Sequence, residues 1–116
     1  MVWEVILYET AAGRCPVCDY FDDLPANEAD ALLGDLELLW RFGIELGMPH
    51  VRHLRGRIYE LRSRGPRMQH RVLYVAWASQ QLVALHAFTK KTQKTPPRDI
   101  RLAESRLDDW ESQQRR

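Results

Sequence analysis

Two arginines, Arg62 and Arg71, stand on either side of a turn signal at Gly65-Pro66. Arg62 ends a strand-like stretch and Arg71 begins the next, so an antiparallel hairpin brings both guanidinium groups near one end of a sheet. Two planar, permanently charged forks match a phosphodiester and stabilise the charge that grows on it during cleavage. The pair therefore predicts a phosphate site. The alternative is a pair of exposed strand-end arginines that deter aggregation.

A second cationic group lies where the last strand-like stretch ends. Lys90 and Lys91 leave that stretch just before a helix that we expect after Thr95, and the N-terminal amides of a helix also attract anions. Lys94 and Arg98 extend the same patch. We expect an anion-binding loop here, in preference to a charged loop that is only solvated.

Histidine is the side chain whose ordinary pKa lies nearest neutral pH, which suits proton transfer at an RNA hydroxyl. His53, His70 and His86 are therefore considered, with His86 or His53 as the proton carrier. Their spacing does not require this role, and His86 lies in an apolar stretch that favours a structural histidine. We expect Tyr59 and Tyr74 to be core residues, and stacking on RNA bases is the alternative role for them.

Basic residues are concentrated in the second half of the chain. Residues 51–101 contain twelve Lys or Arg and two acids, whereas residues 1–50 contain ten acids and two arginines. A block this basic is typical of a surface that binds a polyanion, with RNA or DNA as the first candidate. We expect the other arginines of the block to contact RNA, namely Arg55, Arg57, Arg64 and Arg67.

The sequence contains no nucleotide-binding loop, GxSxG turn or metal-binding cluster. Glu60 and Asp99, the acids of the basic block, are too few to hold a divalent ion well. We therefore expect phosphate chemistry without a metal or other cofactor. RNA suits such chemistry because its own 2′-hydroxyl is the nucleophile.

Cys15 and Cys18 form a single CxxC motif. A closed zinc site needs two further ligands, and redox chemistry needs a thioredoxin-like setting. His50 and His53 could supply the missing ligands, but we expect two reduced cysteines at ordinary helix positions.

The spacing of apolar residues predicts an α+β fold with the order β-α-α-β-β-β-α. Alternating stretches predict a mainly antiparallel sheet with a covered middle strand, and stretches with helical period predict helices packed on it. The expected strands are 2–8, 58–64, 68–78 and 82–88. The expected helices run from Pro16 to Pro25, from an N-cap at Asn27 to about Gly47, and onward from an N-cap at Thr95.

The length predicts one domain over residues 1–116. The sequence has no apolar run long enough to cross a bilayer and no signal-peptide pattern at its start. We therefore expect a cytoplasmic protein without a membrane partner.

Three segments, 54–62, 71–74 and 85–96, together resemble the phage-derived HigB-like branch of the RelE toxin superfamily. The most specific part is Phe88-Thr89-Lys90-Lys91-Thr92-Gln93-Lys94-Thr95-Pro96. The resemblance extends more loosely over residues 2 to about 110 of the chain. It implies the toxin of a type II toxin–antitoxin pair, a metal-free endoribonuclease that cuts messenger RNA on the ribosome. A cognate antitoxin, commonly a helix-turn-helix protein, neutralises such toxins.

By this resemblance, Arg62, Arg71, Lys90 and Lys91 occupy places where members present cations to the scissile phosphate. The chain departs from the pattern in two respects: residues 96–100 lack a Tyr, and residues 58–61 lack the lysines of RelE proper. The superfamily also includes ParE-like gyrase inhibitors. A noncatalytic nucleic-acid-binding module or a gyrase inhibitor is therefore the alternative function.

Overall fold

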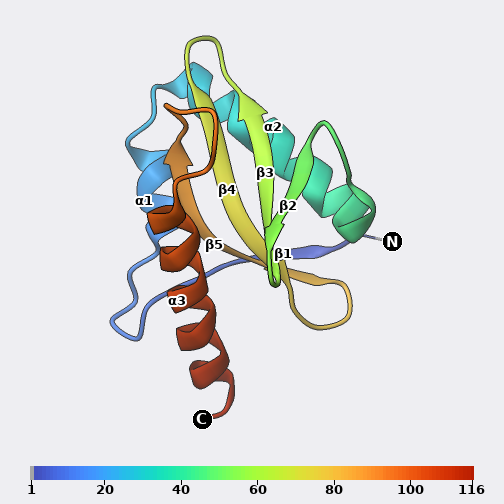
Figure 1. The fold of residues 1–116 in the computed structure, drawn as a ribbon, viewed down its shortest axis with the longest axis vertical. Helices are drawn as coiled ribbons and strands as arrows, with labels where there is room; N and C mark the ends of the chain where they lie inside the picture. The colour runs from blue at the N-terminus through green and yellow to red at the C-terminus, as the bar shows by residue number, and fades with distance from the viewer. Residues whose placement is uncertain (1) are drawn as a thin grey trace.

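The computed structural model describes residues 2–116, in which helices cover both faces of a five-stranded sheet (Figure 1). The strand order across the sheet is β1-β5-β4-β3-β2, with β1 parallel to β5 and all other neighbours antiparallel. The strands are β1 (Glu4–Leu7), β2 (Val51–Arg55), β3 (Ile58–Arg64), β4 (Gln69–Ala76) and β5 (Gln81–Thr89).

Three α-helices and one short 3-10 helix complete the fold. They are α1 (Pro16–Asp22), α2 (Ala26–Phe42), the 3-10 helix η1 (Gly43–Glu45) and α3 (Pro97–Gln114). Within residues 2–116, no helix combines the length and apolar character needed to cross a membrane. The α+β class and the mainly antiparallel sheet agree with the sequence prediction.

The sheet separates two hydrophobic cores. One core lies between the sheet and α1 and α2, and the other lies between the sheet and α3, so α2 and α3 are on opposite sides of the sheet (Figure 1). On β4, Val72 and Tyr74 face the first core while Leu73 and Val75 face the second. This strand is central and buried on both faces, as its two apolar faces predicted.

The predicted element order lacks one strand, because residues 51–55 form β2 and pair with β3. This edge strand has only two apolar residues, Val51 and Leu54, among charged and polar ones. Charged edge strands avoid pairing with other chains, and their composition also hides the period of two in a sequence.

Three predicted helix boundaries are also wrong. The N-cap of α2 is Pro25 and not Asn27, and α2 ends at Phe42 because Gly43 adopts φ 54°, well before Gly47. Thr95 does not cap α3, whose N-cap is Pro96. The Thr95 hydroxyl instead donates to the Glu60 carboxylate on β3. Thr95 therefore makes a long-range hydrogen bond to β3 and not the predicted N-cap hydrogen bond to α3.

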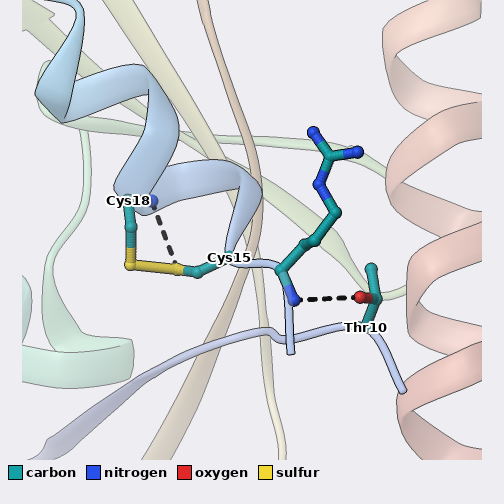
Figure 2. The surroundings of a disulfide bond; sticks show 4 residues. Thr10, Cys15 and Cys18 are labelled. Carbon is teal, nitrogen blue, oxygen red and sulfur yellow. Dashed lines mark hydrogen bonds between the residues drawn. A yellow bond between two sulfur atoms is a disulfide. The ribbon is translucent and has the colours of Figure 1, made fainter. Parts of the chain in front are cut away.

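Cys15 and Cys18 form a disulfide, which corrects the expectation of reduced cysteines at ordinary helix positions (Figure 2). Cys15 is the N-cap of α1, and its sulfur accepts a hydrogen bond from the Cys18 amide at 3.2 Å. The disulfide also excludes the zinc site considered for these two sulfurs. Among residues 2–116, no three His, Cys, Asp or Glu side chains form a group that could hold a metal ion.

The disulfide should stabilise the start of α1 by restricting the unfolded chain. Closing so short a loop is worth about 2 kcal/mol by the chain-entropy argument. We expect a dithiol reductant to lower the melting temperature of the wild-type protein, and the double variant Cys15→Ser/Cys18→Ser to melt at that lower temperature with or without reductant. Thiol alkylation before reduction should label neither cysteine. Full labelling of the untreated protein would contradict the disulfide.

Candidate functional site

Cationic side chains from three neighbouring strands and from the segment after β5 gather on the face of the sheet that α3 covers. Arg62 and Arg71 are direct cross-strand partners, and Arg52 stands opposite Glu60 in the neighbouring row. Cross-strand partners point to the same face, and Glu60 pairs with Leu73 of the core beneath α3, so these residues share that face. In Figure 1, α3 begins beside β5 and runs toward the bottom of the view, and the segment that joins them loops near the tip of the β5 arrow.

Glu60 lies at the centre of this cluster. Its side chain is 1% exposed, and its Oε1 lies 3.7 Å from the Nε of Arg71 and 3.8 Å from the Nε of Arg62. The other carboxylate oxygen accepts the hydroxyl of Thr95. A buried carboxylate needs such partners, so Glu60 and the two arginines hold one another in place.

Two hydrogen bonds fix the guanidinium of Arg71, and its buried Nε has no acceptor within the described part of the chain. It donates to the carbonyl oxygen of His70 at 2.9 Å and to the side-chain oxygen of Gln69 at 3.3 Å. The Nε groups of Arg62 and Arg71 are both buried, and neither has a hydrogen-bond acceptor among residues 2–116. Such unpaired charged donors are costly unless another group supplies the acceptor.

A hollow of about 400 Å³ opens beside these donors. It is lined by Pro49, Arg62, Ser63, Arg64, Gln69 and Arg71. Three of these six residues are arginines, so the hollow is suited to an anion that accepts hydrogen bonds in a fork geometry. The structure thus places Arg62, Arg71 and Arg64 of the predicted set around one hollow.

Lys90 belongs to the same electrostatic cluster. Burial lowers the pKa of the Lys90 ammonium, and the positive charge of Arg71 adds to this effect. Arg62 and Arg52 act in the same direction, whereas Glu60 opposes them. The Lys90 amide donates to the carbonyl oxygen of Gln69 at 2.8 Å, which fixes its backbone beside β4. The other three cations of this patch, Lys91, Lys94 and Arg98, are all exposed.

His86 makes its hydrogen bonds with α3 and not with the arginine cluster. Its Nε2 lies 2.7 Å from Asp99 and its Nδ1 lies 3.1 Å from Arg106. Burial lowers the pKa of His86, and the hydrogen bond to Asp99 acts against this effect. His86 also lines a different cavity of about 480 Å³, together with Arg14 and Arg106. Its surroundings match the structural alternative considered for it, and its role as a proton carrier stays a prediction.

The remaining predicted RNA-binding residues are spread more widely. Arg55 forms an ion pair with Glu104 at 2.6 Å, and Arg57 lies 3.5 Å from Glu111, both on α3. The backbone amide of Arg67 donates to Glu28. The other four aromatic candidates also lie outside the arginine cluster. His53 contacts Tyr59 at the β2–β3 hairpin, Tyr59 and Tyr74 line a small apolar pocket, and His70 lies between Tyr20 and Glu28 on the opposite face of the sheet.

Sequence reasoning missed Glu60 and Arg52 as members of the site. Glu60 had been considered only as a metal ligand. A usable signal was present, because Glu60 and Arg62 are two residues apart in an alternating strand and therefore share a face. A lone acid in register with arginines indicates a charge pair when the strand is buried.

Residues 19–108 match the family described as "Phage derived protein Gp49-like (DUF891)". Two proteins of Mycobacterium tuberculosis, from strains CDC 1551 / Oshkosh and ATCC 25618 / H37Rv, are each 37% identical to this chain over 99 residues. Both are named "Probable endoribonuclease HigB1", and the match covers 84% of this chain and 76% of each relative. The chain therefore belongs to the Gp49-like phage-derived family and is HigB-like.

Proposed function

We propose that this Gp49-like protein is the toxin of a type II toxin–antitoxin pair and an endoribonuclease that cuts messenger RNA on the ribosome. The observation that carries the proposal is that Arg62 and Arg71, both held beside the buried Glu60 carboxylate, line a hollow of about 400 Å³. A phosphodiester in this hollow would accept hydrogen bonds from the two guanidinium groups in a fork geometry. The name of the M. tuberculosis relatives supports the same class of reaction.

In the proposed reaction the 2′-hydroxyl oxygen attacks the adjacent phosphorus and the bond to the 5′ oxygen breaks. The products are a 2′,3′-cyclic phosphate and a 5′-hydroxyl, and the proton lost from the 2′ oxygen is balanced by one gained at the 5′ oxygen. Arg62 and Arg71 bind the non-bridging oxygens, where negative charge increases in the transition state. This step needs no metal because the cations are already in place.

Lys90 suits the leaving-group side of the reaction. Its pKa is lowered by burial and by Arg71, so its ammonium gives up a proton more readily than an ordinary lysine. We assign Lys90 to neutralise or protonate the 5′ oxygen. Lys91, Lys94 and Arg98 then bind flanking phosphates, and because they are exposed they contribute mainly to affinity.

The proposed partner is a cognate antitoxin that blocks this surface. Because Arg62, Arg71 and Lys90 are cationic, the blocking segment should present acids to them, and apolar anchors beside the sheet should add affinity. A helix-turn-helix protein is the expected type of antitoxin, as in the HigB-like branch that the sequence resembles.

The first test is Arg71→Lys, because Arg71→Ala would remove one of the two arginines that compensate the buried Glu60. Lys keeps the charge but loses the fork, so cleavage on translating ribosomes should fall by about 100-fold, as for removal of one transition-state donor. The matched control is Arg41→Lys on α2, which should cleave at the wild-type rate. Wild-type cleavage by Arg71→Lys would overturn the site. Binding to ribosomes without any cleavage by the wild-type protein would favour the noncatalytic alternative.

Lys90 and Lys91 have different surroundings, so their substitutions should affect different steps. Lys90→Ala should slow cleavage more than Lys91→Ala, because Lys90 is within the field of the arginine cluster and Lys91 is exposed. Lys91→Ala should chiefly weaken RNA binding and reduce its salt dependence, by about 0.7 in the logarithmic slope for each phosphate that is no longer neutralised. Equal effects of the two substitutions on rate and on salt slope would contradict this division.

The antitoxin prediction is tested by competition. A saturating cognate antitoxin should prevent both ribosome binding and cleavage, since it covers the cations that contact RNA or prevents the toxin from fitting the ribosome. Sedimentation of the toxin with ribosomes, with and without antitoxin, measures this effect. Unchanged ribosome binding and cleavage in the presence of saturating antitoxin would overturn the toxin assignment.

A further inference from the structure

A chain of buried hydrogen bonds lies on the face of the sheet opposite the arginine cluster. The Glu28 carboxylate on α2 lies 3.0 Å from His70 Nε2 on β4, and His70 Nδ1 lies 2.7 Å from the Tyr20 hydroxyl on α1. The Tyr20 hydroxyl lies 2.8 Å from Thr89 Oγ1 on β5. His70 is 0% exposed and Glu28 is 2% exposed. These hydrogen bonds join two helices to two strands.

A neutral His70 with its proton on Nε2 satisfies every atom of this chain. Nε2 donates to Glu28, Nδ1 accepts from Tyr20, and Tyr20 accepts from Thr89. Burial opposes the charge of Glu28, but hydrogen bonds from the Arg67 amide and from His70 outweigh it and lower the pKa of the Glu28 carboxyl. The network is therefore a fully paired buried group, which rigidifies the strands that it joins.

The same carboxylate holds the turn between β3 and β4. Glu28 Oε2 accepts the amide of Arg67 at 2.8 Å. Gly65 lies so close that a Cβ placed on it would be 1.8 Å from Glu28 Oε1, so this approach requires glycine. The hairpin that carries Arg62 and Arg71 is in this way fixed to α2.

The network lies directly behind the proposed phosphate site. His70 and Thr89 are cross-strand partners, and the residues that follow them are Arg71 and Lys90. Because side chains alternate along a strand, fixing His70 toward α1 and α2 fixes Arg71 toward the opposite face. Lys90 follows Thr89 just beyond β5, where its amide donates to the carbonyl oxygen of Gln69 at 2.8 Å. The His70 carbonyl oxygen also accepts the Arg71 guanidinium at 2.9 Å.

We propose that Glu28, His70, Tyr20 and Thr89 form a positioning network that holds Arg71 and Lys90 at the spacing that a phosphodiester requires. The expected effect of the network on cleavage rests on the proposed function. Its expected effect on the position of Arg71 rests on the hydrogen bonds alone. None of the four residues touches the substrate. They act through the backbone of β4 and β5.

The test is Tyr20→Phe, which removes one oxygen atom and both of its hydrogen bonds. Cleavage at saturating ribosomes should fall by about 10- to 100-fold, because small displacements of catalytic groups cost that much. RNA affinity should stay within about twofold of wild type, since affinity depends on total charge. The matched control is Tyr8→Phe, which removes a tyrosine hydroxyl bonded to Asp109 at 2.5 Å on α3 and should leave cleavage unchanged.

Thr89 supplies a second pair of variants. Thr89→Ser keeps the hydroxyl and should retain cleavage, whereas Thr89→Val keeps the shape, loses the hydroxyl and should reproduce Tyr20→Phe. A merely structural role predicts the same fall in cleavage for Tyr20→Phe and Tyr8→Phe whenever their melting temperatures fall equally. That result would overturn the proposal, as would wild-type cleavage by Thr89→Val.

A measurement without cleavage separates this inference from the proposed function. The Nε proton of Arg71 is buried, so its NMR signal should exchange slowly with water in the wild type and in Tyr8→Phe, and faster in Tyr20→Phe. If the wild type cleaves no RNA but the Arg71 signal responds in this way, the proposed function fails and the network stands. An unchanged Arg71 signal in Tyr20→Phe overturns the network.

Discussion

Charge compensation at Glu60 is the interaction on which the cationic surface depends. Arginines brought together without a counter-charge repel one another, and a carboxylate buried without cations would be strongly destabilising. Glu60 lies within 3.8 Å of both Arg62 and Arg71, and it also accepts the hydroxyl of Thr95. One side chain thus holds two guanidinium groups on the sheet and the segment that follows β5. Because the arginines outnumber this carboxylate, the cluster keeps an excess positive charge for an external anion.

The strand period of two lets one hairpin serve two purposes. His70 of β4 faces α1 and α2 and belongs to a closed, fully paired network, whereas the next residue, Arg71, faces the other side and belongs to an open cationic cluster. Burial leaves no hydrogen bond of the closed network unmade, since each donor has an acceptor within the protein. The open one lines a hollow with arginines, whose like charges repel one another in the free protein and would be compensated by a bound anion. Stability and binding are in this way assigned to opposite faces of the same strands.

The parts of the structure that local patterns determine were predictable from the sequence. The Gly65-Pro66 turn and the alternation on either side of it placed Arg62 beside Arg71, and two apolar faces predicted a central β4. The failures share a physical cause, which is that a distant partner outweighs the local preference. Thr95 has the chemistry of an N-cap but bonds to Glu60, 35 residues away. The network behind the site was invisible for the same reason, because Tyr20 and Thr89 are 69 residues apart. The Cys15–Cys18 disulfide is the exception, since its spacing was visible and only its oxidation state was misjudged.

The separation of charge along the chain becomes a separation of charge in space. The acidic first half supplies α1 and α2, which cover one face of the sheet, while the basic second half supplies the strands whose cations point to the other face. An approaching polyanion is therefore attracted to the arginine cluster and repelled from the acidic helices α1 and α2 on the other face. The attraction falls with salt, whereas the hydrogen-bond geometry at Arg71 does not, because buried groups are screened little. Long-range charge therefore governs the approach of a polyanion, and the hydrogen bonds and ion pairs of Glu60 and Glu28 fix the positions of the cationic groups that it would contact.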